Sequence, residues 1–148
     1  MSFIGKSIQR IDAVSKVNGS AKFIDDYYFD SMLYARIFRA PVPRGRIKNL
    51  DLSAAEKLAG IKGIFTAKDI PGANIVPVVE KDQPLLADEV FNFAGEAIAI
   101  VVADDPDIAE EGVSLIKLDY EELPSILTIE DSINKTVPDI CSKPDNIF

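Results

Sequence analysis

The sequence predicts an α+β domain in which two main helices pack against a mixed β-sheet. Segments with alternating apolar and polar residues recur along the chain, and this alternation is typical of β-strands. Two further segments contain the signals that start helices. Strands and helices do not alternate regularly, which argues against a doubly wound parallel sheet and favours an α+β arrangement.

The predicted strands span residues 21–24, 32–40, 46–52, 63–67, 96–103 and 117–121. An Asn-Gly pair predicts a tight turn at 17–20, before the first of these strands. In the second strand, alternation places Leu33 and Ile37 on one face and Arg36 on the other. The strand at 96–103 is apolar on both faces, so we expect both of its faces to be covered.

The predicted helices begin at recognisable caps. Ser53 and Glu56 form a capping-box pattern, and Gly60 is suited to end the short helix that follows. Asp105, which precedes a proline, fits the cap of a second and longer helix with apolar residues at helical spacing. A further capping pattern at Thr128 predicts a last short helix.

Composition limits the possible functions. The length of 148 residues fits one domain, and no apolar run approaches the ~18 residues that a membrane helix needs. The chain has no histidine and one cysteine, which excludes Ser-His-Asp and Cys-His catalysis, an internal disulfide and most zinc sites. The start has no apolar stretch typical of a secretory signal, and we expect a reducing, cytoplasmic location. A net charge of −8 argues against nucleic-acid binding.

Three groups of carboxylates are the candidates for acid–base or metal chemistry. They are Asp25 and Asp26; Asp104, Asp105 and Asp107; and Glu121 and Glu122. None of them has the spacing of a calcium loop, and helix caps or solvated surface positions explain them better. The sequence also has no glycine-rich phosphate loop.

The remaining candidates are a basic cluster, an aromatic patch and a thiol. The basic cluster consists of Arg36, Arg39, Arg44, Arg46 and Lys48. It could bind a phosphate or an acidic partner, although an exposed surface is the simpler interpretation. For Tyr27, Tyr28 and Phe29 we expect packing in the core or at a domain interface. Cys141 has no activating neighbour in sequence, so we expect an incidental thiol.

Six ordered motifs resemble those of a known family. The first, at 10–26, begins with Arg-Ile-Asp, continues with a Lys-Val-Asn-Gly turn and ends in two acids. The second, at 32–41, is Met-Leu-Tyr-Ala followed by Arg-Ala-Pro, and the third is a segment at 60–72 that ends in Asp-Ile-Pro-Gly. The last three are Pro-Leu-Leu-Ala at 84–87, Gly-Glu-Ala-Ile-Ala at 95–99 and Asp-Tyr-Glu-Glu-Leu-Pro at 119–124. Over residues 5–133 the chain resembles the large, molybdenum-binding subunit of the xanthine dehydrogenase and aldehyde oxidase family. Ala97 stands where that family often has proline, and 42–44 lack its histidines, which weakens any inference about substrate.

The resemblance implies an α/β-hammerhead domain over residues 1–137, with a tail at 138–148 that leads toward molybdopterin-binding domains. It also implies a parent enzyme that hydroxylates purines, heterocycles or aldehydes with oxygen from water at a molybdopterin–molybdenum centre. No position matches the family's catalytic or cofactor motifs, so we expect no catalytic residue and no bound cofactor in this chain. Iron–sulfur clusters and FAD are expected in other domains or subunits. Those parts and the molybdopterin-binding domains are the implied partners, with no nucleic acid or membrane partner.

The long polar loop at 74–84 is a further candidate for a functional site. Loops of this kind often line access routes, so Val78, Val79 and Glu80 are candidates to border the substrate funnel of the parent enzyme; an ordinary surface loop is the alternative. We also expect the isolated domain to expose apolar surface and to self-associate. Two other functions stay open: a non-catalytic binding or assembly module with the same fold, and an autonomous enzyme that uses the carboxylate groups.

Overall fold

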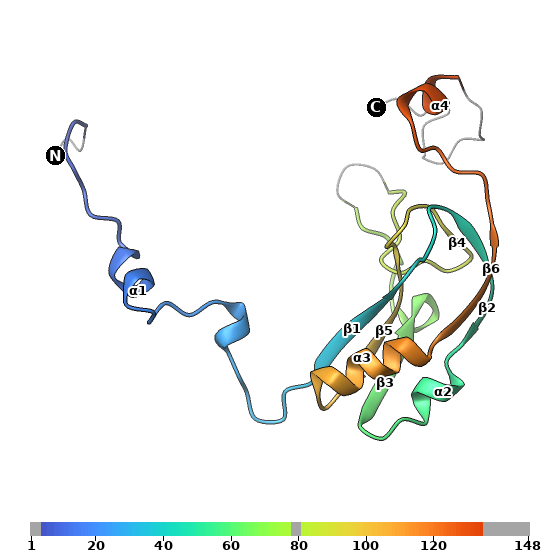
Figure 1. Ribbon diagram of the computed structural model, residues 1–148, viewed down its shortest axis with the longest axis horizontal. Helices are drawn as coiled ribbons and strands as arrows, with labels where there is room; N and C mark the ends of the chain where they lie inside the picture. Colours follow the sequence, from blue (N-terminus) through green and yellow to red (C-terminus); the bar gives the residue numbers. More distant parts are fainter. Residues whose placement is uncertain (1–3, 78–80, 135–148) are drawn as a thin grey trace. The chain divides into compact units, whose positions relative to one another are not determined.

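The computed structural model describes residues 4–77 and 81–134, and the chain divides into two compact units (Figure 1). The first unit spans Met1–Met32 and the second spans Leu33–Phe148. Every strand of the described residues lies in the second unit, whereas the first unit contains only short helical segments. The tail predicted at 138–148 lies outside the described residues.

The first unit contains the helix α1 (Ala13–Val17) and the 3-10 helix η1 (Ile24–Asp26). The predicted turn between them is confirmed, because Gly19 has a positive φ of 75°. The side chain of Asn18 also accepts two hydrogen bonds within this turn, from the backbone and the hydroxyl of one serine. An Asn-Gly pair therefore reverses the chain here, as its sequence indicates.

The strand predicted at 21–24 is wrong. A strand is stabilised by the hydrogen bonds of a neighbouring strand, and this segment pairs with none of the described strands. The carboxylate of Asp26 instead accepts a hydrogen bond of 2.8 Å from the backbone N–H of Phe23, which closes the helical turn η1. Local side-chain chemistry thus decides the conformation where no sheet is available.

The second unit contains two three-stranded antiparallel sheets (Figure 1). In the first sheet the order is β1-β5-β3, and these strands are β1 (Tyr34–Arg39), β5 (Ala97–Ala103) and β3 (Ile61–Thr66). In the second sheet the order is β4-β2-β6, and these strands are β4 (Val90–Phe91), β2 (Gly45–Asp51) and β6 (Lys117–Glu122). The α+β class is confirmed, but the strands form two antiparallel sheets where we expected one mixed sheet.

The connection between β1 and β2 helps to explain the division into two sheets. Pro41 and Pro43 lie in this connection, and proline has no backbone N–H to donate to a ladder. The two strands therefore do not continue into a hairpin, and each pairs with strands that come much later in the sequence. The two-residue strand β4 was not predicted, because alternation cannot be recognised over so short a segment.

The central strand β5 buries one of its faces more fully than the other. Ala99, Val101 and Ala103 have no exposed surface, and the helix α3 (Pro106–Leu115) contacts this strand. On the opposite face, Ile100 is only half-buried, as is the valine two positions later. Ile98, which is 1% exposed, shares this second face, so the expectation that both faces are covered is confirmed fully for one face and in part for the other.

The helix α3 lies close to the first sheet because of its cap and a glycine. The carboxylate of Asp105 accepts a hydrogen bond of 2.8 Å from the backbone N–H of Asp107, so the predicted cap is confirmed. A Cβ atom on Gly112 would lie 2.9 Å from side-chain atoms of both Ile61 and Val101. Glycine at this position allows the helix to approach the sheet.

The helix α2 (Ser53–Glu56) begins differently from the prediction. Its N-cap is Leu52, and Ser53 makes no capping bond. The carboxylate of Asp51 instead accepts hydrogen bonds from the backbone N–H and the hydroxyl of Ser53, at 3.0 Å and 2.6 Å. The predicted capping box is therefore wrong, because an acceptor two residues earlier competes for the serine. The predicted left-handed residue after the helix is confirmed, since Gly60 has φ of 96°.

Two short helical segments complete the second unit. The helix α4 (Ile129–Ile133) begins as predicted, because the hydroxyl of Thr128 accepts a hydrogen bond of 3.1 Å from a backbone N–H. The 3-10 helix η2 (Ala67–Asp69) directly follows β3 and was not predicted as a separate element.

Two clusters of buried residues form the core of the second unit. One consists of Ala40, Ala87, Phe91 and Ile98, and the other of Ala55, Ala99, Val101 and Ile116. The ring of Phe91 packs edge-on against Tyr120 of β6, with 5.9 Å between the ring centroids. A Cβ atom on Gly45 would lie 2.4 Å from the Phe91 ring, so β2 needs a glycine where this ring covers it.

Candidate functional site: the groove between the two sheets

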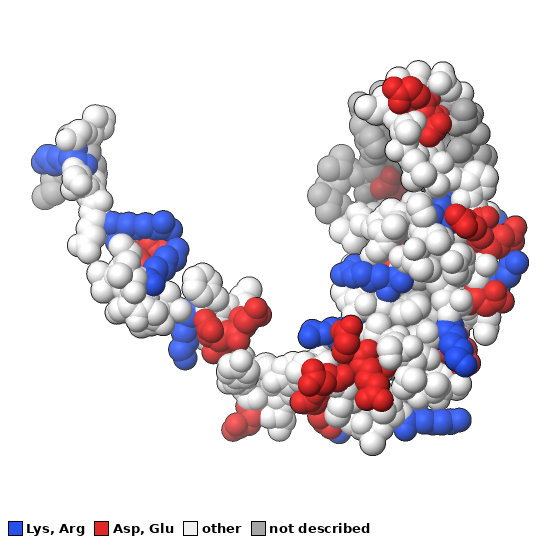
Figure 2. Space-filling model, in the orientation of Figure 1, with Lys and Arg blue, Asp and Glu red and all other residues white. Residues whose placement is uncertain are grey.

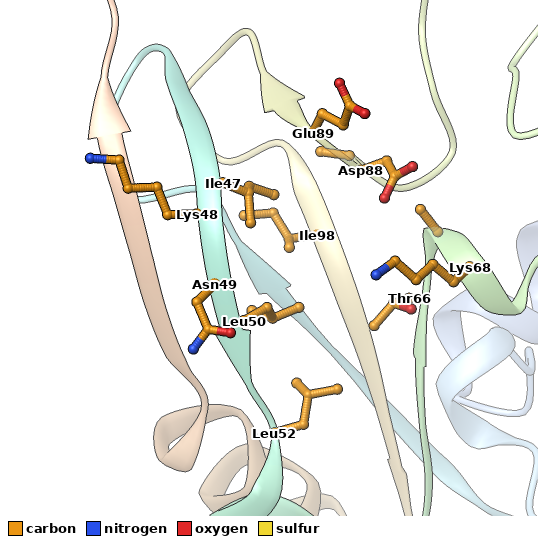
Figure 3. A pocket seen from close by; sticks show the side chains of 12 residues that line it. Ile47, Lys48, Asn49, Leu50, Leu52, Thr66, Lys68, Asp88, Glu89 and Ile98 are labelled. Carbon is orange, nitrogen blue, oxygen red and sulfur yellow. The ribbon is translucent and has the colours of Figure 1, made fainter.

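A groove of about 490 Å³ lies between β2 of the second sheet and the end of β3 in the first (Figure 3). We call it the intersheet groove. Its lining residues come from four segments: Ile47, Lys48, Asn49, Leu50 and Leu52 from β2 and just after it, Thr66, Ala67 and Lys68 from β3 and η2, Ala87, Asp88 and Glu89 from the segment before β4, and Ile98 from β5.

The inner surface of the intersheet groove is apolar. Ile47 and Leu50 of β2 point into it, and Ile98 of β5 points toward them (Figure 3). Lys48 points the other way (Figure 3), and its ammonium group lies 3.7 Å from the carboxylate of Glu121 on β6. The groove therefore presents a strip of apolar side chains, with polar lining residues such as Thr66 beside it.

The rim of the intersheet groove is polar and carries both signs of charge. Lys68 on one side and Asp88 with Glu89 on another are all exposed (Figure 3). An apolar interior with a polar rim is typical of surfaces that receive apolar groups from a partner.

One side of the groove is fixed by the Asp-Ile-Pro-Gly motif. The carboxylate of Asp69 accepts hydrogen bonds from the backbone N–H and the hydroxyl of Thr66, at 2.7 Å and 2.9 Å. These two bonds favour the charged form and lower the pKa of Asp69. The motif thus ends β3 and holds Ala67 and Lys68 at the groove.

The Gly-Glu motif before β5 also has a structural role. Glu96 is the one buried charged residue among the described residues, and its carboxylate accepts a hydrogen bond from the backbone N–H of Asn92. The backbone of Ala40 exchanges two further hydrogen bonds of 2.9 Å with this turn, at Gly95 and Glu96. These bonds position the start of β5. Sequence reasoning missed this role, although a glutamate directly before an apolar strand is a recognisable signal.

The base of the loop at 74–84 is closed by the side chain of Asn74. Its amide group donates a hydrogen bond of 2.7 Å to the carbonyl of Leu86 and accepts bonds of 3.0 Å from the backbone of both Leu85 and Leu86. The backbone N–H of Val76 also donates to the carbonyl of Gln83. The two ends of the loop are therefore joined, a feature that the sequence did not reveal because both ends look alike as polar coil.

The candidate funnel residues of this loop are Val78, Val79 and Glu80. All three lie outside the described residues, so their role stays a prediction.

Members of the three carboxylate groups bind partners within their own units. Asp104 pairs with Lys62 at 2.8 Å, and Glu121 pairs with Lys48. Asp105 caps α3, and Asp26 closes a turn in the first unit. Acidic side chains do gather over α3 (Figure 2), but the described residues contain no group of three or more possible metal ligands. The surface and capping interpretation accounts for these contacts.

The basic cluster is also divided among separate partners. Arg36 donates to Glu110 of α3 at 3.2 Å. Arg39 donates to the carbonyl of Gly95 at 2.8 Å, and Arg44 donates to a carbonyl after β6 at 3.1 Å. Figure 2 shows basic side chains scattered among acidic ones on the second unit. These arginines bind parts of their own domain, so they do not form one anion site.

The aromatic patch lies in the first unit and is exposed there. Tyr27, Tyr28 and Phe29 are 50–76% exposed, and the ammonium group of Lys22 lies 5.6 Å from the ring centroid of Tyr27. Packing in a core is therefore not observed for these rings, and packing at a domain interface stays a prediction. Cys141 lies outside the described residues. No helix within 4–77 or 81–134 is long and apolar enough to cross a membrane.

The sequence matches a known family over most of its length. Residues 18–124 match the family described as aldehyde oxidase and xanthine dehydrogenase, a/b hammerhead domain. This range includes both sheets and α3.

Individual relatives agree with this match. The chain is 41% identical over 137 residues to the nicotinate dehydrogenase large molybdopterin subunit of Eubacterium barkeri, covering 93% of this chain and 32% of the relative. It is 37% identical over 132 residues to xanthine dehydrogenase 1 of Arabidopsis thaliana, covering 88% of this chain and 10% of the relative. The chain thus spans a third or less of the length of these relatives.

Solved structures show the same fold within much longer chains. The aldehyde oxidoreductase of Desulfovibrio desulfuricans has a TM-score of 0.87 at 29% identity, covering 97% of this chain and 17% of that chain. The quinoline 2-oxidoreductase of Pseudomonas putida has a TM-score of 0.80 at 32% identity, covering 91% of this chain and 18% of that chain. The two antiparallel sheets with few helices are therefore the hammerhead fold, and the chain belongs to the aldehyde oxidase and xanthine dehydrogenase family of molybdenum hydroxylases.

Proposed function

We propose that this chain is the hammerhead scaffold domain of a molybdopterin-dependent hydroxylase subunit. The parent enzyme would oxidise purines, heterocycles or aldehydes with water as the source of oxygen, and the domain alone would be inactive. The main support is the difference in coverage with the aldehyde oxidoreductase, which matches 97% of this chain but is matched over only 17% of its own length. A domain with that relation to a family enzyme is a part of a larger catalytic unit.

The described side chains give no direct support for binding the molybdopterin–molybdenum cofactor in this domain. They provide no group of three possible metal ligands. The rim of the intersheet groove carries two carboxylates, Asp88 and Glu89, against the single cation Lys68, a balance that disfavours the phosphate of a pterin cofactor. We therefore propose that the cofactor binds in other domains of the subunit, and that iron–sulfur clusters and FAD belong to further domains or subunits.

The proposed partners follow from this division. They are the molybdopterin-binding domains of the same subunit and the iron–sulfur and flavin parts of the enzyme, in the cytoplasm.

We also propose that the isolated chain self-associates through its exposed apolar side chains. In the first unit these include Ile4, Ile8, Ile11, Val14, Val17, Phe23, Ile24, Tyr27, Tyr28 and Phe29. Light scattering at high protein concentration tests this, and a monodisperse monomer would contradict it.

We further propose that the loop at 74–84 borders the substrate funnel. The hydrogen bonds of Asn74 support this, because they fix the base from which the loop extends. In the intact enzyme, alanine at Val78, Val79 and Glu80 should then change KM or substrate preference. The control is the double variant Gly72→Ala and Ala73→Ser, because both positions are exposed and lie outside the loop. Unchanged kinetics in the triple variant would remove this part of the proposal.

The decisive experiment measures molybdenum content and hydroxylase activity in two samples. One sample is this 148-residue chain, and the other is the longest natural product of its gene. We expect molybdenum and the oxidation of a purine, heterocycle or aldehyde in the longer product alone. Absence of molybdenum from both would favour a non-catalytic binding or assembly module with the same fold.

A further inference from the structure

The strand β2 is paired along its whole length on one side only. On that side β6 pairs with residues from Gly45 to Asp51, with a register shift at Lys48. On the other side β4 pairs with Gly45 and Arg46 alone, and one further bond of 2.8 Å joins the backbone of Ile47 and Glu89. From residue 48 to residue 51, no described strand lies on this edge.

The unpaired edge of β2 faces the intersheet groove. Residues 47–50 are the part of β2 that lines the groove, and the apolar side chains of Ile47 and Leu50 point into it (Figure 3). Unpaired strand edges readily accept another strand, because their N–H and C=O groups lack partners. An apolar groove beside such an edge provides places for the side chains of an added strand.

We propose that an extended polypeptide segment from the molybdopterin-binding part of the same enzyme pairs with β2 at residues 48–51 and places apolar side chains in the intersheet groove. This inference rests on the proposed function. The added segment would continue the line of β4, whose pairing with β2 stops at Ile47. It therefore extends an existing ladder and needs no new sheet.

The length of the relatives provides the source of such a segment. The nicotinate dehydrogenase subunit matches this chain over only 32% of its length, so most of that protein is available to supply a strand. The rim adds a preference for a particular composition. Lys68 and the pair Asp88 and Glu89 favour a segment with an apolar centre and flanking residues of both charges.

Amide hydrogen exchange of residues 48–51 tests the proposal. The measurement compares the 148-residue chain with the purified assembly that contains the longest natural product of its gene. We expect the groove-facing amides to exchange at least about tenfold more slowly in the assembly, because paired strand amides open rarely. Equal rates in both samples, with molybdenum present in the assembly, would overturn the inference and leave the proposed function intact.

A pair of matched variants adds a second test. Ala67 lines the groove, so Ala67→Phe should fill it, whereas Ala54→Phe adds the same ring on the exposed surface of α2. In the assembly we expect Ala67→Phe alone to restore fast exchange at 48–51. Retained protection in Ala67→Phe, with an unchanged thermal unfolding midpoint, would contradict the proposal. If Ala67→Phe does not fold, the difference in exchange rate between the unmodified 148-residue chain and the unmodified assembly decides whether the proposal holds.

Two further outcomes identify other causes. Protection that already occurs in the concentrated 148-residue chain, together with a dimer in light scattering, would show that a second copy occupies the groove and would overturn the choice of partner. An assembly without molybdenum would instead remove the proposed function, and with it the identity of the segment.

Discussion

The two units of this protein contrast in how their apolar residues are used. In the second unit, Phe91, Ile98 and Val101 are at most 1% exposed and lie between two sheets and α3. In the first unit, no described residue is buried, and Ile11 and Ile24 are among its many exposed apolar residues. Similar residue types therefore form a core between the two sheets and α3 but remain exposed in the first unit, as do Ile37 and Phe65 on the outer part of the paired strands. The contrast teaches that packing against a second layer, more than local composition, determines burial here.

The largest expected effect distinguishes two phenylalanines. Phe91→Ala should lower the free energy of unfolding by about 3–5 kcal/mol, because it leaves a cavity in the core. Phe29→Ala, at a side chain that is 71% exposed, should change it by about 0.5 kcal/mol or less. Denaturant unfolding followed by circular dichroism measures both. Equal losses would mean that the first unit shares the core of the second.

A glycine pair tests how tightly the second unit is packed. Gly112→Val should lower the free energy of unfolding by about 1–3 kcal/mol, because new atoms would overlap Ile61 and Val101. Gly72→Val is the control, since a Cβ atom at Gly72 meets no atom within 4 Å. The same unfolding experiment applies. A Gly112→Val protein as stable as the original would show that α3 can move away from the sheet without cost.

Two helix starts allow a smaller comparison between the units. Asp105→Ala should cost about 1 kcal/mol, because Asp105 accepts capping bonds from the backbone of α3. Asp12 stands at the same position of α1 but makes no side-chain capping bond. Asp12→Ala should therefore leave the main unfolding transition unchanged. A loss of stability in Asp12→Ala that matches the loss in Asp105→Ala would contradict this difference between the two caps.

The smallest effect concerns pH. The pKa of Asp69 is lowered from 3.8 by hydrogen bonds from Thr66, and the pKa of Asp12 is lowered mainly by Lys16 and then by Arg10. A lowered pKa in the folded state stabilises that state above 3.8, and this stabilisation disappears as the pH falls through the folded pKa. The stability difference between the unmodified protein and Asp69→Asn should therefore shrink at low pH. Asp12→Asn should show the same trend in the unfolding of the first unit, and a difference there that does not change with pH would contradict the prediction.

Local patterns in the sequence predicted most of the elements of the second unit. Strands such as β5 were predicted correctly because their alternation and apolar content are properties of neighbouring residues. Caps were predicted where one side chain bonds to its own helix, as at Asp105 and Thr128. The prediction failed at Ser53, because Asp51 competes for the same donors.

The arrangement of the strands and the candidate site could not be predicted in the same way. Pairing depends on residues far apart in the sequence, so one mixed sheet and two antiparallel sheets fit the same alternation. The intersheet groove collects residues between Ile47 and Ile98 from four separate segments. The family resemblance predicted the hammerhead fold, and its motifs contain several residues of this groove, but it gave none of them a role in a site.

The hydrogen bonds of Asn74 have a consequence for how this domain can be altered. One amide group joins the two ends of a loop, so the fold beneath it does not depend on which residues the loop contains. Each doubling of loop length costs only about 0.6 kcal/mol in closure entropy. Insertions and substitutions between Val76 and Gln83 should therefore change the stability of the domain little, in evolution and in protein engineering alike. Replacement of Asn74 would remove the bonds that join the loop ends and with them this tolerance.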